Sequence, residues 1–177
     1  DGNEMWDFHN GFGSMLQGHA HPVIGEAVLE RYGKGTHFAA PTEDALAVAE
    51  NLSSRWGLPK WRYTNSGSES TMDAIRIARA YTGRDTVMKI FGSYHGHHDT
   101  VMVSIGVEYD KIGDRDNLAS LPYGGGIPDA TVQMTVPVPF NDAEAMERRI
   151  IRLTDEGRKP ACVIMEPAMM NLGVVLP

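Results

Sequence analysis

Two hydroxyl side chains around a glycine form the first candidate for chemistry in this sequence. Ser66-Gly67-Ser68 precedes a run whose apolar residues have helical spacing. The first N–H groups of a helix lack intrahelical acceptors and lie at the positive end of the helix dipole. Together with the hydroxyl groups of Ser66 and Ser68, these N–H groups could bind a phosphate. The alternative is an ordinary helix start, because Ser is a preferred N-cap residue.

The residues that this turn lacks narrow the choice of phosphate ligand. No lysine follows the turn as it does in the P-loop of nucleotide-binding proteins. The G-x-G-x-x-G spacing of dinucleotide-binding proteins is also absent. The turn therefore favours a phosphate carried by a molecule other than a nucleotide.

A second cluster, Tyr94-His95-Gly96-His97-His98-Asp99, follows a predicted apolar strand and has two interpretations. An aromatic ring and an imidazole at the end of a strand could contact a planar cofactor that the phosphate site anchors. Alternatively, this cluster could bind a metal ion through its imidazole and carboxylate groups, which are those of His95, His97, His98 and Asp99. The order is similar to the His-x-His-x-Asp-His motif of metallo-β-lactamase-like hydrolases, but the final histidine is missing. For His19 and His21, two residues apart in a glycine-rich loop, we expect structural roles and no metal.

Two polar residues close the set of candidates. Glu166 ends a predicted buried strand, where a carboxylate is costly unless it is hydrogen-bonded or faces a cleft. Asn171 follows in the next loop and offers a neutral donor and acceptor. A strand-end glutamate that faces solvent is the alternative for Glu166.

The order of elements that position these residues predicts an α/β fold. Period-2 and apolar runs predict strands over residues 5–8, 62–65, 86–91, 131–139 and 161–165. Helical spacing and capping residues predict helices that begin near Pro22, Thr42, Gly67 and Asn141. Parallel strands bring their carboxyl ends to one edge of a sheet, so the candidate residues are expected to meet there. The polar stretch from 106 to 129 is expected to be a lid or a disordered segment.

Composition excludes several classes of function. The net charge is −7 and no basic run offsets it, which argues against a nucleic-acid partner. No apolar run approaches the length that spans a membrane. The single cysteine, Cys162, excludes a disulfide within the chain and favours a reducing, cytoplasmic compartment. Both ends look cut, so we expect a fragment of a longer enzyme.

Several motifs, in order along the whole chain, closely resemble those of class III pyridoxal-phosphate aminotransferases, in the branch that includes glutamate-1-semialdehyde 2,1-aminomutase. They are Asp1-Gly2-Asn3, Gly18-His19-Ala20-His21-Pro22, Ala40-Pro41-Thr42, Asn65-Ser66-Gly67-Ser68-Glu69-Ser70, Ala74-Ile75-Arg76-Ile77-Ala78-Arg79 with Thr82-Gly83-Arg84, Tyr94-His95-Gly96-His97, and Glu166-Pro167 with Asn171 and Gly173. The resemblance implies the fold of fold-type-I enzymes, a mainly parallel sheet with flanking helices. Residues 1–41 would form an N-terminal segment and residues 42–177 part of the large cofactor-binding domain.

The resemblance also implies roles for the candidate residues toward pyridoxal 5'-phosphate. The phosphate would be held by Ser66, Gly67 and Ser68, where the family usually has Thr in place of Ser68. Tyr94 would stack on the pyridine ring with His95 beside it. Asn171 would contact the ring hydroxyl oxygen, and Glu166 would support the cofactor. Phe12 would lie on the substrate side, where the aminomutases tend to have Trp.

The implied activity is transfer of an amino group between an amino acid or amine and a keto acid or aldehyde, by a homodimer. Glutamate-1-semialdehyde aminomutase is the alternative within the family. Phe12 and the polar stretch from Val107 to Pro128, which differs from the mobile loop of the aminomutases, favour the transaminase. The Schiff-base lysine and the aspartate that pairs with the pyridine nitrogen are expected downstream, since no lysine here matches that motif. The chain's lysines are Lys34, Lys60, Lys89, Lys111 and Lys159.

Overall fold

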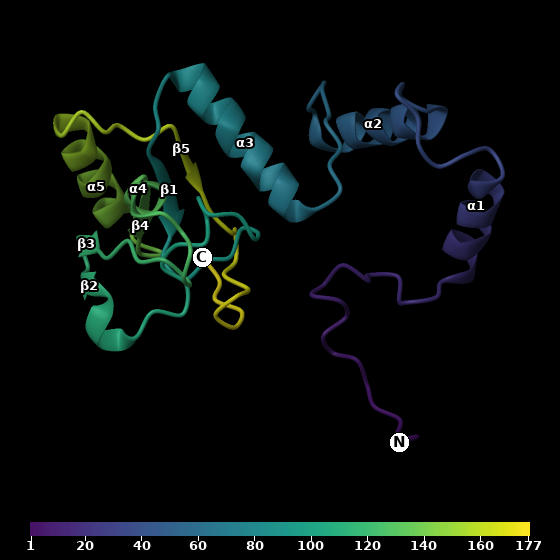
Figure 1. Cartoon of the computed structure of the whole chain (residues 1–177), viewed down its shortest axis with the longest axis horizontal. Helices are drawn as coiled ribbons and strands as arrows, with labels where there is room; N and C mark the ends of the chain where they lie inside the picture. The colour runs from purple at the N-terminus through teal and green to yellow at the C-terminus, as the bar shows by residue number, and fades with distance from the viewer. The chain divides into compact units, whose positions relative to one another are not determined.

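The computed structural model describes residues 1–177 and divides into two compact units, residues 1–61 and residues 62–177. Figure 1 shows the helices and strands of both units along the chain. All of the candidate residues except Phe12 belong to the second unit. The division does not coincide with the predicted domain boundary after residue 41, which stays a prediction.

The first unit consists of two helices and the loops beside them. Helix α1, Pro22–Tyr32, begins with a proline at its first position. Helix α2, Glu43–Trp56, begins after Thr42, whose hydroxyl oxygen accepts a hydrogen bond from the N–H of Ala45 at 3.4 Å. Neither helix has a buried residue. The predicted strand over residues 5–8 is wrong, because no second strand in this unit provides its hydrogen-bonding partner.

The second unit is built on a parallel sheet of three strands, which confirms the α/β prediction. The strands are β1, Val87–Ile90, β4, Thr135–Val138, and β5, Cys162–Ile164, in the order β4-β1-β5. Val87 in the central strand pairs with Thr135 on one side and Cys162 on the other. The chain passes from β4 through helix α5, Ala143–Asp155, to β5.

Side chains of the central strand alternate between two apolar layers. Met88 and Ile90 pack with Leu153 of α5 in one cluster. Val87 packs on the opposite face with Ile75 of helix α3, Gly67–Thr82. The two helices therefore cover opposite faces of the sheet (Figure 1). By this alternation Lys89 belongs to the face of Val87, and its side chain is fully buried.

Several predicted boundaries are corrected by the structure. Residues 62–65 form no strand, because none of the described strands pairs with them. The strand predicted from residue 131 begins at Thr135, because the short helix α4, Asp129–Gln133, precedes it. Asp142, not Asn141, caps α5, and Asn141 has a φ of +56°. Strand β5, predicted to be buried, is only half-buried, whereas β4 at the other edge of the sheet is fully buried.

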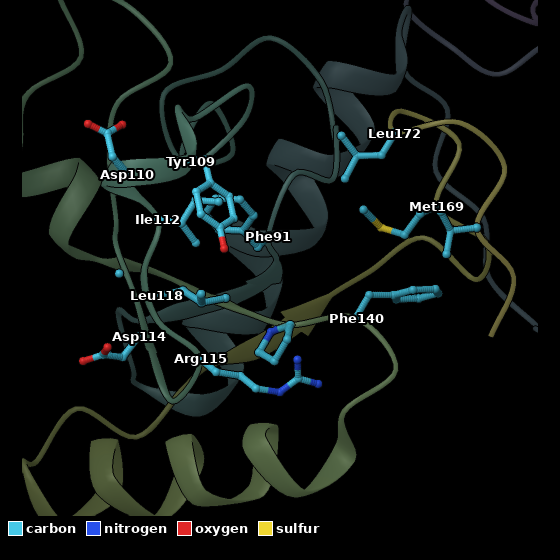
Figure 2. A pocket seen from close by; sticks show the side chains of 13 residues that line it. Phe91, Tyr109, Asp110, Ile112, Asp114, Arg115, Leu118, Phe140, Met169 and Leu172 are labelled. Carbon is cyan, nitrogen blue, oxygen red and sulfur yellow. The ribbon is translucent and has the colours of Figure 1, made fainter.

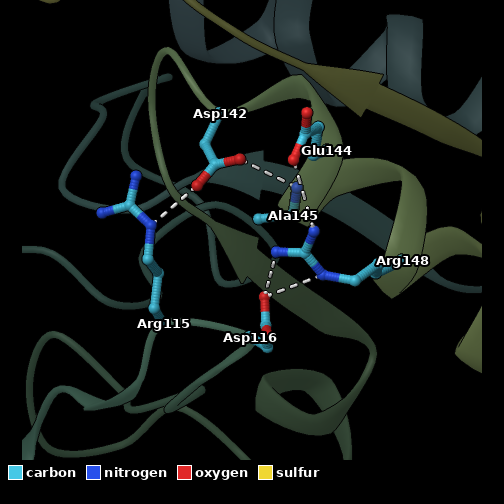
Figure 3. Close-up of polar contacts among 6 residues, drawn as sticks. All are labelled: Arg115, Asp116, Asp142, Glu144, Ala145 and Arg148. Atoms are coloured by element: carbon cyan, nitrogen blue, oxygen red, sulfur yellow. Dashed lines mark hydrogen bonds and ion pairs between the residues drawn. The ribbon is translucent and has the colours of Figure 1, made fainter.

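The polar stretch between residues 106 and 129 contains ordered structure. It includes a 3₁₀ turn, η1, Tyr109–Lys111, and a hairpin of β2, Gly113–Asp114, with β3, Asn117–Leu118. Two ion pairs connect this hairpin to α5 and to its N-cap residue (Figure 3). Arg115 Nε lies 2.7 Å from an oxygen of Asp142, and Arg148 Nη2 lies 2.7 Å from an oxygen of Asp116.

No helix of the structure has the length and apolar character needed to span a membrane.

Candidate functional site

The first turn of α3 is organised by two side-chain caps. Ser66, the N-cap, has an extended backbone with φ −153°, and its hydroxyl oxygen accepts from the N–H of Glu69 at 3.2 Å. The Glu69 carboxylate in turn accepts from the N–H of Asn65 at 2.6 Å. Ser66 and Glu69 have the Ser-x-x-Glu spacing of a capping box, which is a sequence signal for the start of a helix. Gly67 and Ser68 precede the first intrahelical hydrogen bond, so their N–H groups remain available to an anion.

Helix α3 is fastened at this end to the loop that follows β1. Ser68 Oγ accepts a hydrogen bond from the N–H of His97 at 2.8 Å. One turn later, Thr71 Oγ1 donates to the carbonyl oxygen of His95 at 2.6 Å. Since a serine hydroxyl carries one proton and the His97 N–H supplies its own, the Ser68 proton remains free to be donated. The predicted phosphate turn and the Tyr94–Asp99 cluster are thus brought together.

Gly96 makes this close approach possible. Its φ is +108°, and a β-carbon at this residue would lie 2.7 Å from the Cα of Ser68. That distance is shorter than real side chains tolerate, and the backbone conformation is one that favours glycine.

His95, next to Tyr94 in the chain, is held as a neutral imidazole. Ser93 Oγ donates to the carbonyl oxygen of Ile90 at 2.6 Å and lies 2.9 Å from His95 Nε2. Because the serine proton is already used, Nε2 must be the donor, which leaves Nδ1 as an acceptor. Burial, with the nearby charge of Lys89, lowers the pKa of His95 to about 4. Tyr94 between these buried residues is 45% exposed, so its ring is accessible to a ligand.

Glu166 and Asn171 follow β5 and reach the same edge of the sheet. Asn171 Nδ2 donates to the carbonyl oxygen of Gly92, just beyond β1, at 2.9 Å. One oxygen of Glu166 accepts from the N–H of Met170 at 3.4 Å. The other, Oε2, is buried without a hydrogen-bond partner. A buried acceptor without a donor is costly, so this oxygen is suited to a donor supplied by a ligand.

Sequence reasoning missed Lys89. Its ammonium group donates hydrogen bonds to three carbonyl oxygens, those of Ser93, Val101 and Val103. Burial lowers the pKa of Lys89 to about 8, and the charge of Glu166 opposes this shift. The only available signal was a lysine within an otherwise apolar run, which is usually interpreted as an exposed side chain.

The alternative metal site is not assembled. The structure contains no group of three or more His, Cys, Asp or Glu side chains that could hold a metal ion. The imidazole of His95 is engaged by Ser93, whereas His98 Nε2 lies 3.2 Å from Thr71 Oγ1. In the first unit, His19 Nε2 lies 2.8 Å from Asp7 and lowers the pKa of that carboxyl to about 2.

Phe12 belongs to the first unit and is described there by itself. Its side chain is 92% exposed, its φ is +56°, and its ring contacts that of His9 edge-on at 4.0 Å between centroids. The placement of Phe12 on the substrate side of the site stays a prediction.

A cavity of about 760 Å³ lies at the same edge of the sheet, among the loops that follow β1, β4 and β5 (Figure 2). Its walls come mainly from the polar stretch, the end of β4 and the loop after β5, with Tyr109, Leu118, Phe140 and Leu172 among the lining residues. None of the predicted site residues lines it. The candidate residues therefore lie beside this cavity, around the start of α3, and do not line it.

Comparison with known proteins gives the family. The model of the family described as Aminotransferase class-III matches residues 1–177. Glutamate-1-semialdehyde 2,1-aminomutase from Methanothermobacter thermautotrophicus is 42% identical over all of this chain and 40% of its own length. The enzyme of the same name from Methanopyrus kandleri is 40% identical, with 100% of this chain and 39% of the relative covered.

Solved structures agree on the fold. An omega-transaminase from Sphaerobacter thermophilus matches with a TM-score of 0.87 and 40% identity, over 96% of this chain and 38% of that one. A glutamate-1-semialdehyde aminomutase from Pseudomonas aeruginosa matches with a TM-score of 0.79 and 30% identity, over 96% of this chain and 35% of that one. The chain thus spans about two-fifths of the length of the relatives it matches. The parallel sheet is that of fold-type-I enzymes. The chain belongs to the class III aminotransferases, a family that depends on pyridoxal phosphate.

Proposed function

We propose that this chain forms the phosphate-binding and ring-binding part of a pyridoxal-phosphate-dependent aminotransferase. One observation carries the proposal: the start of α3 is hydrogen-bonded to the loop that bears Tyr94, beside the sheet edge that bears Glu166 and Asn171. When bound, the cofactor supplies an electron sink for the carbanion that forms when the substrate loses its α-proton.

The residues of this chain would hold and orient that cofactor. The N–H groups of Gly67 and Ser68, with the Ser68 hydroxyl proton, supply donors for the phosphate oxygens. The exposed ring of Tyr94 supplies an apolar surface for stacking. The free lone pairs of Glu166 Oε2 can accept a hydrogen bond from a donor group of the ligand. The residues present therefore fit the cofactor.

The lysine of the reaction is expected outside the described residues. Lys89 lies in the central strand of the sheet, and all three of its protons are donated to carbonyl groups. Residues 1–177 would thus position the cofactor, and a downstream lysine and aspartate would complete the site. A homodimer and a cytoplasmic location remain part of this proposal, the latter supported by the single unpaired cysteine.

A second candidate is glutamate-1-semialdehyde aminomutase. It is favoured by the curated relatives of that name, which are 37–42% identical over the whole chain. The transaminase is favoured by the omega-transaminase structure at 40% identity and by Phe12 in place of a tryptophan. An aminomutase moves the amino group within one molecule, whereas a transaminase requires a separate donor and acceptor.

The test uses the full-length natural protein. Purified protein is expected to show an absorbance band near the visible edge that borohydride alters, as expected for pyridoxal phosphate bound to a lysine. It is then given either glutamate 1-semialdehyde alone or an amine with a keto acid. Turnover only in the second assay supports the transaminase, and turnover of the semialdehyde alone supports the aminomutase. Protein with stoichiometric zinc and no chromophore would contradict both.

A further inference from the structure

Lys89 is a charged residue at the centre of an apolar sheet. It is fully buried, and it lies in the middle strand with a paired strand on each side. Its Nζ donates to the carbonyl oxygens of Ser93 at 2.8 Å, Val101 at 3.1 Å and Val103 at 2.7 Å. An ammonium group has three protons, so every proton has an acceptor. A buried charge is tolerated only with such complete pairing.

The three carbonyl groups belong to the two ends of one loop. Ser93 directly precedes Tyr94, whereas Val101 and Val103 follow the histidine cluster. The ammonium group of Lys89 thus binds both the beginning and the end of the loop that carries Tyr94. The same segment is tied at its centre to α3, through Ser68 and Thr71.

The charge of Lys89 has a counterpart at the same edge of the sheet. Glu166 acts on Lys89 electrostatically and raises the pKa that burial lowers. At neutral pH the ammonium form therefore persists. The Glu166 carboxylate thus stabilises the charge of the ammonium group that holds the loop.

Resting on the function proposed above, we propose that Lys89 is a positioning residue for the cofactor. It does not touch the ligand but fixes the loop from Ser93 to Val103, so that the ring of Tyr94 is in place before the cofactor binds. An apolar side chain at residue 89 would leave three buried carbonyl groups without donors and release the loop. Such pre-organisation improves affinity for the cofactor because the loop loses less conformational entropy on binding.

The experiment compares Lys89→Met with the exposed control Lys111→Met in the full-length natural protein, freed of cofactor and titrated with pyridoxal phosphate. We expect the dissociation constant to rise by roughly tenfold in Lys89→Met, with loss of the visible circular dichroism of the bound cofactor. The control should match the wild type. Tyr94→Ala should weaken binding much less in the Lys89→Met background than alone, because the ring is already released.

The opposite result is a lower Tm in Lys89→Met with the wild-type dissociation constant and circular dichroism, measured well below the Tm. That result would overturn the proposal and leave Lys89 a structural residue. If Lys89→Met does not fold, Lys89→Gln, which keeps two N–H donors, takes its place.

Hydrogen exchange of the cofactor-free wild type provides a measurement that needs no variant. We expect the amides of residues 92–104 to be protected nearly as well as those of β1. Rapid exchange of the loop beside a protected sheet would contradict the proposal. Failure of the wild type to bind pyridoxal phosphate would refute the proposed function instead, and hydrogen exchange would still report whether the loop is fixed.

Discussion

Ser68 and His97, far apart in sequence, are joined by a hydrogen bond of 2.8 Å from the N–H of His97 to the Ser68 hydroxyl oxygen. This bond aligns the serine so that its own proton is free for a ligand. It also sets the distance between the start of α3 and the loop that carries Tyr94.

Replacing Ser68 tests the phosphate site directly. Ser68→Ala should bind pyridoxal phosphate about 5- to 10-fold more weakly, because one donor of about 1 kcal/mol is lost. Ser68→Thr keeps the hydroxyl group and should remain close to the wild type. Titration of the cofactor-free, full-length protein measures both. Equal affinities for the alanine and threonine variants would count against a role of this hydroxyl in phosphate binding.

Tyr94→Ala should weaken retention of the cofactor through loss of stacking, by about 1 kcal/mol. Tyr94→Phe keeps the ring and should behave like the wild type. Tyr81→Ala, whose side chain is 91% exposed on α3, is a matched control for removal of a surface tyrosine. The rate at which cofactor dissociates is the measurement. An unchanged rate in Tyr94→Ala would exclude the stacking role.

Gly96→Ala should be strongly destabilising. A β-carbon there meets the Cα of Ser68 at 2.7 Å, and the φ of +108° is strained for alanine. We expect a loss of about 2 kcal/mol or more in the free energy of unfolding. Gly124→Ala is the control, since that glycine has open space around it and no positive φ. Urea unfolding of the two variants compares them, and similar midpoints would show that the close approach does not exist.

The stability of the protein should fall in mild acid because of His95. Its pKa is lowered from 6.5 to about 4, with burial as the largest cause. The unfolded chain binds this proton below about pH 6.5, while the folded chain stays neutral until about pH 4. The free energy of unfolding should therefore decrease as the pH falls through this window, by at most about 1.4 kcal/mol per pH unit.

Denaturant unfolding at several pH values, with His95→Gln, measures this contribution. Glutamine replaces the Nε2 donor but does not titrate, so the dependence on pH should flatten. Burial also lowers the pKa of His98, and the double variant with His98→Gln should flatten it further. A slope in His95→Gln equal to that of the wild type would refute the assignment.

Asp142 should stabilise α5 chiefly as its cap. One carboxylate oxygen accepts from the N–H of Ala145 at 2.9 Å, and the other accepts from Arg115 at 2.7 Å (Figure 3). Asp142→Ala should lower the Tm by roughly 2–4 °C. Asp142→Asn keeps a capping oxygen and loses only an exposed ion pair, so its Tm should be near that of the wild type. Differential scanning calorimetry distinguishes the two; an equal loss in both would assign the effect to the ion pair.

Local signals in the sequence predict helices better than strands in this chain. Helix α3 begins after Ser66 and ends before Gly83, as predicted, because a cap and a left-handed glycine act on their immediate neighbours. The strand predicted over residues 62–65 fails because a strand exists only with a partner, which pattern alone does not supply. Helix α4 before Thr135 was missed because five residues are too short to show a helical period.

The sequence predicted which segments meet at the candidate site, but not the contacts between their side chains. Parallel strands explain why Tyr94 and Glu166 were expected at one edge. The contacts that fix the loop could not be foreseen, because a lysine within a strand gives no sign that its ammonium group is buried against carbonyl groups. The approach of Gly96 to Ser68 depends on tertiary packing in the same way.

The pairing of β1 with both β4 and β5 has a consequence for how the chain folds. Val87 pairs with Thr135 and Cys162, and both partners are far from Val87 in the sequence. Pairings between distant segments form slowly because each closes a long loop before it gains a contact. The carbonyl groups that Lys89 binds lie inside the first of these loops. The contacts of Lys89 with Ser93, Val101 and Val103 close much shorter loops than either strand pairing. The slow steps of folding are therefore expected to be the pairings of the sheet, and not the ordering of the loop that Lys89 holds.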